Sequence, residues 1–233
     1  GDRDAEKSLL AHVHAHPLSE CETTRSARRL KMDISTDSLR PLFAAGAQEK
    51  EWPTKVDRLL EVMVDKLCLY APREIFANDL TIESGFSASL LHLDRNNLRN
   101  AGEGVRSRGA LQRSLHEEVE KEGLTRAGAE LLLTVADMKG YLDLAMETAP
   151  FYRQSRVAEA QGLEETLFAQ VMPYLEPLVS KAYPKLRDAY VGLPEDASPE
   201  ALKQWVESLV SMLAEVLSKK GLRLECRLSV TPQ

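Results

Sequence analysis

The feature that most constrains this chain is a helical period near its carboxyl end, over residues 198–221. Apolar residues there recur at every third or fourth position, namely Leu202, Trp205, Val206, Leu209, Met212, Leu213, Val216 and Leu217. This spacing puts them on one face of an α-helix, which has to be buried against a core. Ser198 is a favourable N-cap, and the run from Lys219 to Gly221 is typical of a helix end. A fold of this chain must therefore supply an apolar surface for this helix.

The same period recurs along most of the chain and predicts a multi-helix bundle. Residues 53–70 repeat it, and residues 88–100 and 105–122 carry it on either side of a glycine-containing break. Residues 125–148 are apolar around most of the circumference, so we expect the central helix of the bundle there. Three prolines interrupt the period within residues 163–190 and predict kinked or serial short helices. The predicted fold class is all-α, with about seven to nine helices.

The carboxyl-terminal residues 222–230 change to a period of two, which predicts one short β element. Its apolar residues alternate with polar ones: Leu222, Leu224, Cys226, Leu228 and Val230. A strand needs a partner for its backbone groups. Residues 80–83, where Leu80 and Ile82 alternate, are one candidate partner, and the same strand of a second copy is the other.

Two polar stretches suggest how the chain is divided. Residues 18–38 are polar and weakly periodic, which is typical of a linker. We therefore expect an amino-terminal helix or arm with its linker over residues 1–34, followed by a main helical domain over residues 35–233. Residues 191–198 contain glycine, proline and acidic residues, and they predict a minor joint inside that domain.

Charge, apolar content and cysteine usage argue against several classes of protein. The formal net charge of -6 over 233 residues disfavours a dedicated binder of nucleic acid or anionic membrane, since both need a concentrated basic surface. No run of about 18 apolar residues is present, so no membrane-spanning helix is expected. The widely spaced Cys21, Cys68 and Cys226 favour a reducing compartment. The expected location is the cytoplasm, unless an export signal preceded the first residue.

Three of the five histidines stand at alternate positions, His12, His14 and His16, and they are the candidate metal ligands. In a strand their rings would share one face, whereas in a helix His12 and His16 would stack and His14 would point away. The helical arrangement needs a third ligand, which Glu20 or Cys21 could supply after the following turn. The alternative is a mobile histidine cluster that binds nickel or zinc without a biological role. The sequence favours this alternative, and no cofactor is predicted.

No set of residues in the sequence matches a catalytic motif. His116 lies in LHEEVEKEG, but Glu120 stands where a helical zinc-protease motif has its second histidine. A nucleophile elbow of the form GxSxG is absent, and so are the lysine and hydroxyl of a phosphate-binding Walker loop. These absences favour a protein without catalytic activity.

Two further groups are candidates for binding. The one sizeable basic region contains five arginines: Arg95, Arg99, Arg106, Arg108 and Arg113. They could contact phosphates or an acidic partner, but the lack of aromatic residues for base stacking disfavours nucleic acid. Tyr174, Tyr183 and Tyr190 lie among the prolines of residues 163–190 and could line a small-molecule pocket.

The leading functional hypothesis is a non-catalytic helical module that binds another protein, as an adaptor, regulator or assembly partner. It rests on the lack of a catalytic set and on four methionines that fall on apolar faces: Met138, Met146, Met172 and Met212. Two alternatives stay open, a sensor or enzyme with a pocket near residues 163–190, and contact with phosphate or nucleic acid through residues 95–113. A homo-oligomer through the carboxyl-terminal strand is also compatible with the sequence.

Overall fold

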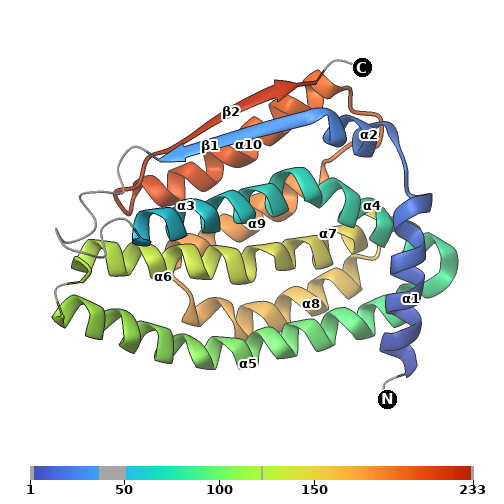
Figure 1. The fold of residues 1–233 in the computed structure, drawn as a ribbon. Coiled ribbons are helices and arrows are strands. Elements are labelled where there is room, and N and C mark those ends of the chain that lie inside the picture. Colours follow the sequence, from blue (N-terminus) through green and yellow to red (C-terminus); the bar gives the residue numbers. More distant parts are fainter. Residues whose placement is uncertain (1–2, 37–50, 122, 232–233) are drawn as a thin grey trace.

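Helices make up most of the computed structural model, which describes residues 3–36, 51–121 and 123–231 (Figure 1). In chain order they are α1 (Arg3–Leu18), α2 (Glu22–Arg29), α3 (Glu51–Val64), α4 (Ala71–Thr81), α5 (Ser87–Glu120), α6 (Arg126–Tyr141), α7 (Ala145–Arg153), α8 (Val157–Gln170), α9 (Pro177–Val191) and α10 (Pro199–Ser218). Two strands, β1 (Leu30–Thr36) and β2 (Leu224–Val230), form an antiparallel pair. The predicted all-α class with a short carboxyl-terminal β element is therefore confirmed.

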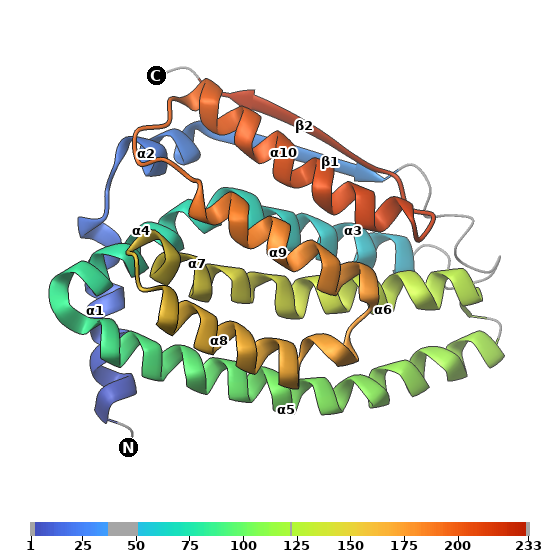
Figure 2. The same ribbon diagram turned by 180° about the vertical axis from the view of Figure 1, so that it is seen from behind.

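The long helices lie side by side, with the sheet on one side and α1 across one end (Figures 1 and 2). α5 forms the side of the bundle opposite to the β1–β2 pair, which packs on α10. α1 runs crosswise to α5 and contacts both α4 and α5. The core between these layers contains the fully buried rings of Tyr183 and Tyr190. α1 therefore packs across one end of the bundle, and its axis is not parallel to those of the long helices.

The two strands pair along their whole length in a register that gathers their apolar side chains. Met32 lies opposite Leu228, and Ile34 lies opposite Cys226. All four side chains pack against the core, since residues directly opposite each other in an antiparallel pair share a face. The alternation that predicts a strand at the carboxyl end is confirmed, although the strand begins at Leu224.

The partner predicted for this strand, residues 80–83, is wrong. These residues continue α4 into a wide helical turn, which ends where Gly85 takes a positive φ of 88°. Two alternating apolar residues fit a helix as well as a strand, so the pattern there is too short to decide. The actual partner, residues 30–36, alternates over a longer span, but it lies inside the stretch whose polar composition is typical of a linker.

The most periodic predicted helix agrees closely with α10. The Ser198 hydroxyl accepts a hydrogen bond from the amide of Ala201 at 3.2 Å, which confirms the predicted N-cap. Gly221 takes a φ of 81° after the last turn, a conformation that glycine adopts without strain. Residues 163–190 fall in α8 and α9 with a short turn between them, as their prolines predict.

Two predicted helix boundaries are wrong in the middle of the chain. The glycines at 102 and 104 do not break α5, which is continuous over 34 residues. Gly102 lies next to Gln170 of α8, and contacts of this kind outweigh the low helix propensity of glycine. The helix predicted over residues 125–148 is instead divided into α6 and α7 by a 3-10 turn at Leu142–Leu144.

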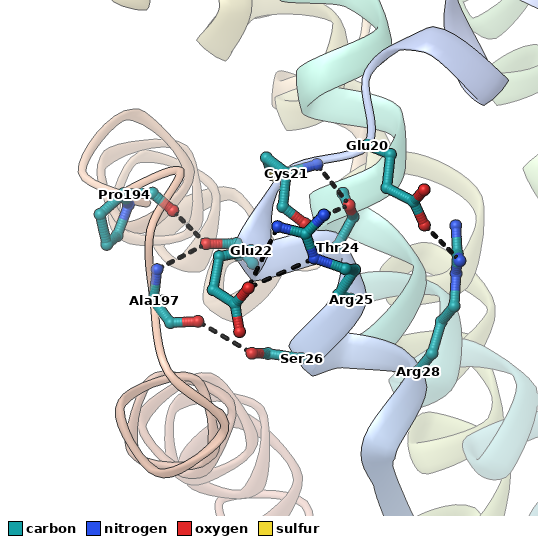
Figure 3. A network of polar contacts seen from close by, with 10 residues as sticks. Glu20, Cys21, Glu22, Thr24, Arg25, Ser26, Arg28, Pro194 and Ala197 are labelled. Carbon is teal, nitrogen blue, oxygen red and sulfur yellow. Dashed lines mark hydrogen bonds and ion pairs between the residues drawn. The ribbon is translucent and has the colours of Figure 1, made fainter. Parts of the chain in front are cut away.

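Most of the predicted linker forms α2 and β1, and the predicted domain boundary after residue 34 lies inside β1. Figure 3 shows how α2 is fastened to the segment between α9 and α10. The Thr23 hydroxyl donates to the carbonyl of Pro194 at 2.6 Å and accepts from the amide of Ala197 at 2.9 Å. The Ser26 hydroxyl donates to the carbonyl of Ala197, also at 2.9 Å. These bonds hold α2 against residues 191–198, the stretch predicted to be a minor joint.

Candidate functional site

The first helix turns its polar side towards the protein and its apolar side outwards. Ser8 and Ala15 are buried, and His12 and His16 lie on the same face, against α4. The opposite face carries large apolar side chains that are at least 54% exposed: Leu9, Leu10, Val13 and Leu18. An amphipathic helix that covers a core has the reverse arrangement. Both faces of α1 are therefore candidates for a binding function.

On the inward face, His12 and His16 meet the carboxylate of Glu74, and we call these three residues the His–Glu cluster. His12 Nε2 lies 3.3 Å from Glu74 Oε2, and His16 Nε2 lies 3.2 Å from Glu74 Oε1. One ligand atom from each residue lies within 4.8 Å of the other two. In the part of the chain that the structure describes, no other group of His, Cys, Asp or Glu side chains is arranged closely enough to share a metal ion.

Helical geometry explains how the cluster forms. His12 and His16 are four residues apart, so they occupy successive turns, and their rings meet edge to face with 4.5 Å between centroids. His14 points to the other side, where its Nδ1 lies 2.7 Å from the carbonyl oxygen of Leu10. Glu74 stands in the first turn of α4, which the contact between α1 and α4 brings next to the two rings.

Burial and hydrogen bonding oppose each other at Glu74. Burial raises the pKa of its carboxyl, but hydrogen bonds from His12 and Tyr70 and the nearby histidine charges bring that pKa below its ordinary value. Burial lowers the pKa of His16, against the attraction of Glu74. Near neutral pH these shifts favour a neutral His16 ring and an ionised Glu74, which are the protonation states that metal ligands need.

Three polar atoms on the inward face of α1 are buried and have no hydrogen-bond partner in the described structure: Ser8 Oγ, His12 Nδ1 and His16 Nδ1. A buried polar atom without a partner costs about 1–3 kcal/mol. The inward face of α1 is therefore a polar surface that contacts within the described residues leave partly unsatisfied.

The sequence pattern identifies two of the three members of the cluster. Glu20, one predicted third ligand, instead pairs with Arg28 at 2.6 Å (Figure 3). Cys21, the other, precedes α2, and its amide donates to the Thr24 hydroxyl at 3.0 Å. Glu74 escapes prediction because it lies far along the chain, in a stretch where an acidic residue is unremarkable in a helix. Only the packing of α1 on α4 brings it to the histidines.

Along the edge between its two faces, α1 borders a groove of about 410 Å³, whose other wall is the end of α4 and the turn that follows it; we call it the α1 groove. Leu10 and Leu18 supply large apolar side chains on one wall, and Phe86, 41% exposed, supplies one on the other. Ala11 and Ala15 lie between them and leave room because their side chains are small. The groove is apolar enough to receive another apolar surface.

The three tyrosines predicted to line a pocket do not share a cavity. The hydroxyl of Tyr183 is hydrogen-bonded to that of Thr148 at 2.8 Å in the core. The hydroxyl of Tyr190 donates to the carbonyl of Leu67 at 2.7 Å, also in the core. Tyr174 is 60% exposed and borders a hollow of about 590 Å³ between α5 and the end of α8. The structure therefore places two of the three in structural roles.

α5 carries all five predicted arginines, and the structure divides them into two groups. Four are exposed: Arg95, Arg99, Arg106 and Arg113. Arg99 and Arg106 line the same hollow as Tyr174. Arg108 instead holds the buried carboxylate of Asp137 with two nitrogens, at 2.8 and 3.0 Å. Because a buried carboxylate needs this partner, Arg108 has a structural role.

A buried acid pair, Asp94 of α5 and Glu147 of α7, is not apparent from the sequence. Burial raises the pKa of Asp94 well above its ordinary value. Burial, with a contribution from Asp143, raises that of Glu147 from 4.5 to about 8. Asn97 donates to Glu147 Oε1 at 3.1 Å. Glu147 is therefore mainly protonated at neutral pH, and the pair links stability to pH.

Comparisons with protein-family models, with curated proteins and with solved structures find no match for this chain. In the described ranges, no helix combines the length and the apolar character that crossing a bilayer requires. The geometry of the two faces of α1 is therefore the basis for a proposal of function.

Proposed function

We propose that the protein is a non-catalytic binding module that receives an amphipathic helix of another protein in the α1 groove. The observation that carries the proposal is the outward apolar face of α1, where Leu10 is 60% and Leu18 is 75% exposed. Contiguous apolar surface on a water-exposed helix is typical of a protein contact site. The proposal agrees with an adaptor, regulator or assembly partner, the class that the sequence favours.

The shape of the groove supports a helix as the occupant. Residues that line it on α1 run from Lys7 to Leu18, which is roughly 17 Å at the helical rise and matches about three turns of a partner helix. The small side chains of Ala11 and Ala15 leave space into which a ridge of side chains can pack. A partner of this kind would anchor itself through apolar residues spaced three and four apart.

The charge of the groove favours an acidic partner. Lys7, which forms an exposed ion pair with Asp4 at 3.5 Å, and His14 are the ionisable residues that line it. A helix with acidic residues beside its apolar stripe would complement them, and complementary charge directs the orientation of docking. We place this binding in the cytoplasm, because Cys21, Cys68 and Cys226 are free thiols and so agree with a reducing compartment.

Self-association through β2 stays a separate prediction. β2 has a partner within its own chain, β1, so the strand does not need a second copy to satisfy that edge. α1, which borders the α1 groove, lies across one end of the bundle, on a different part of the molecule from β2. The two contacts can therefore be tested independently.

Site-specific photocrosslinking in the native host tests the proposal. A benzophenone amino acid replaces Leu10 in the groove, and in a matched control it replaces Leu111, an exposed leucine of α5. We expect a discrete adduct from position 10 whose crosslinked peptide belongs to an amphipathic helix of another protein. Leu18→Asp should weaken that adduct at least about tenfold, because a charge would enter the apolar contact.

Three outcomes of this experiment would contradict the proposal. An adduct between two copies of this chain would identify the groove as a self-interface. Equal adducts from positions 10 and 111 would show non-specific contact. An adduct that Leu18→Asp leaves unchanged would show that the groove is not the surface in contact.

A second candidate function, the binding of an anionic small molecule, is favoured by the hollow beside Tyr174. Arg99 and Arg106 line it together with this tyrosine and with one acidic residue, Glu103, although the sequence relates the arginines and the tyrosine to different predicted sites. Arginine can hold a phosphate or carboxylate with two nitrogens, and the tyrosine ring can cover an apolar part of the ligand. Native mass spectrometry of the protein purified from its host checks this function. A bound anion that Arg106→Ala removes would support it, and a protein without bound mass would contradict it.

A further inference from the structure

We propose that His12, His16 and Glu74 bind a divalent transition-metal ion of the zinc type, and that this ion fixes α1 to α4. The donor atoms carry the first step of the argument. Two imidazole nitrogens with one carboxylate oxygen are a ligand set that Zn²⁺ uses in proteins, with bonds of about 2.0–2.2 Å. Ca²⁺ and Mg²⁺ prefer shells of oxygen atoms, so this set selects against them.

The distances in the cluster fit a shared ion. In a tetrahedral site with bonds of about 2.0–2.1 Å, neighbouring ligand atoms lie about 3.3 Å apart. His12 Nε2 lies 3.3 Å from one Glu74 oxygen, Oε2, and His16 Nε2 lies 3.2 Å from the other, Oε1, so each ring nitrogen is already at ligand spacing from the carboxylate. One nitrogen of each ring and one carboxylate oxygen all lie within 4.8 Å of one another, a spacing that small side-chain rotations could shorten around an ion.

The surroundings of the cluster also favour a metal ion over two bound protons. The rings of His12 and His16 are 4.5 Å apart between centroids, so charging both rings places two cations side by side. One divalent ion accepts the Nε2 lone pairs of both neutral rings and neutralises the Glu74 carboxylate. Tyr70 lies near enough to Glu74 to influence the pKa of its carboxyl, and a contact from outside the ligand set can orient a metal-bound carboxylate.

The ion would explain why α1 presents its polar side to the bundle. The three ligands come from two helices, so the free energy of metal binding stabilises the docked position of α1. Three protein ligands leave a fourth position, which a water molecule can fill. The same ion would hold the α1 groove in place, although the metal site does not depend on the proposed partner. Either proposal can therefore fail without the other.

The rival explanation is a histidine-rich segment that binds metal by chance. Such binding would use His14 as readily as its neighbours, and it would not involve Glu74, which lies on a different helix. The proposal therefore makes opposite predictions for His14 and Glu74.

Titration of the metal-free, full-length protein with Co²⁺ and then Zn²⁺ tests the site, with visible absorption and calorimetry as readouts. We expect one Co²⁺ per chain, with the intense visible absorption of a four-coordinate ion, displaced by Zn²⁺. Glu74→Gln and His16→Ala should weaken binding at least about 100-fold, since each removes a ligand. His14→Ala, the matched control on the outward face, should bind as the unchanged protein does. Zn²⁺ should raise the melting temperature of the unchanged protein and of His14→Ala, and not that of Glu74→Gln.

A variant that gains a spectroscopic signal keeps the test decisive if Glu74→Gln or His16→Ala folds poorly. His16→Cys replaces one metal ligand by another, so its Co²⁺ complex should acquire a near-ultraviolet thiolate charge-transfer band. His14→Cys should not acquire it. The proposal is overturned if the unchanged protein binds neither ion at micromolar concentration, if Glu74→Gln binds as tightly as the unchanged protein, or if position 14 gives the thiolate band and position 16 does not.

Discussion

α1 and α10 are both amphipathic helices on the surface of the bundle, yet they face it with opposite sides. α10 buries Leu209 and Leu213 and exposes Glu207 and Ser211. α1 buries Ser8 and places its histidines against α4, while its leucines point outwards. Apolar periodicity therefore defines two faces of a helix, but it does not decide which face touches the protein.

The orientation of α1 has a cost that α10 does not carry. Leaving a leucine side chain in water forgoes about 1.5–3 kcal/mol relative to its complete burial. The position of α1 therefore needs a further stabilising interaction, which α10 does not require. The two proposals supply it, with a metal ion on the inward face of α1 and a partner helix on the outward face. The packing of apolar side chains alone should therefore hold α10 on the bundle, whereas the position of α1 should depend on the ion and the partner that it binds.

The largest expected effect belongs to the core face of α10. Leu213 is fully buried, so Leu213→Ala should lower the free energy of unfolding by about 2–5 kcal/mol through lost burial and the cavity left behind. Urea denaturation measures this change. Ser211→Ala, on the exposed side of the same helix, is the control and should change stability little. A loss below about 1 kcal/mol at Leu213 would remove the contrast with α1.

The next largest effect is a pH dependence of stability that comes from the acid pair. It also shows a second way of keeping a polar group in the interior. In the His–Glu cluster a metal ion would neutralise the ligands, whereas Glu147 is neutralised by its own proton. Its pKa rises from 4.5 to about 8 on folding, so the folded state holds the proton more tightly in that range. Stability should therefore fall as pH rises from about 4.5 to about 8, by at most the roughly 5 kcal/mol that a shift of this size corresponds to, and change little from this source above that.

Glu147→Gln should flatten this pH dependence, because glutamine does not titrate. Urea denaturation between pH 5 and pH 9 measures both proteins. Glu117→Gln, at an exposed position of α5, is the matched control and should leave the slope as it is. Equal slopes for the unchanged protein and Glu147→Gln would show that the pair does not govern the pH response.

A smaller effect should come from the joint that connects α1 to the bundle through α2. Thr23→Val keeps the shape of the side chain but removes the hydroxyl, which leaves the Ala197 amide without its acceptor. We expect a loss of about 1–2 kcal/mol, typical of a buried polar group left unpaired. Chemical denaturation measures it, and amide hydrogen exchange at Ala197 should quicken. Unchanged exchange at Ala197 would mean that the hydrogen bond does not hold this joint.

The sequence predicts best where the signal is local. The stripe of α10 and its Ser198 cap lie within a few turns of each other, and both are confirmed. The strand at the carboxyl end is likewise visible from its own alternation. Its partner is not, because the pairing of β1 with β2 joins the two ends of the chain and no local pattern records such a contact. The Gly102 region of α5 escapes prediction for the same reason, since its support comes from Gln170 of α8.

The candidate site repeats this division. The spacing of His12 and His16 is a local feature, so the sequence shows that a helix would place both rings on one face. Glu74 and the orientation of α1 are properties of the fold, because they depend on which side of α1 meets α4. The hypothesis of a mobile histidine cluster follows from the sequence alone. The contact of both rings with the Glu74 carboxylate is the observation from which we propose an ordered site for the same residues.

The smallest expected effect, at Leu10, is the most direct test of the comparison between the two helices. Leu10→Ala makes the same chemical change on α1 that Leu213→Ala makes on α10, but at a side chain that is 60% exposed. In the isolated protein we expect a change within about 0.5 kcal/mol, because little burial is lost and alanine favours the helix. Urea denaturation with and without Zn²⁺ measures it. A loss of 2 kcal/mol or more would mean that α1 buries this leucine in solution, and both proposals for α1 would then lose the orientation on which they depend.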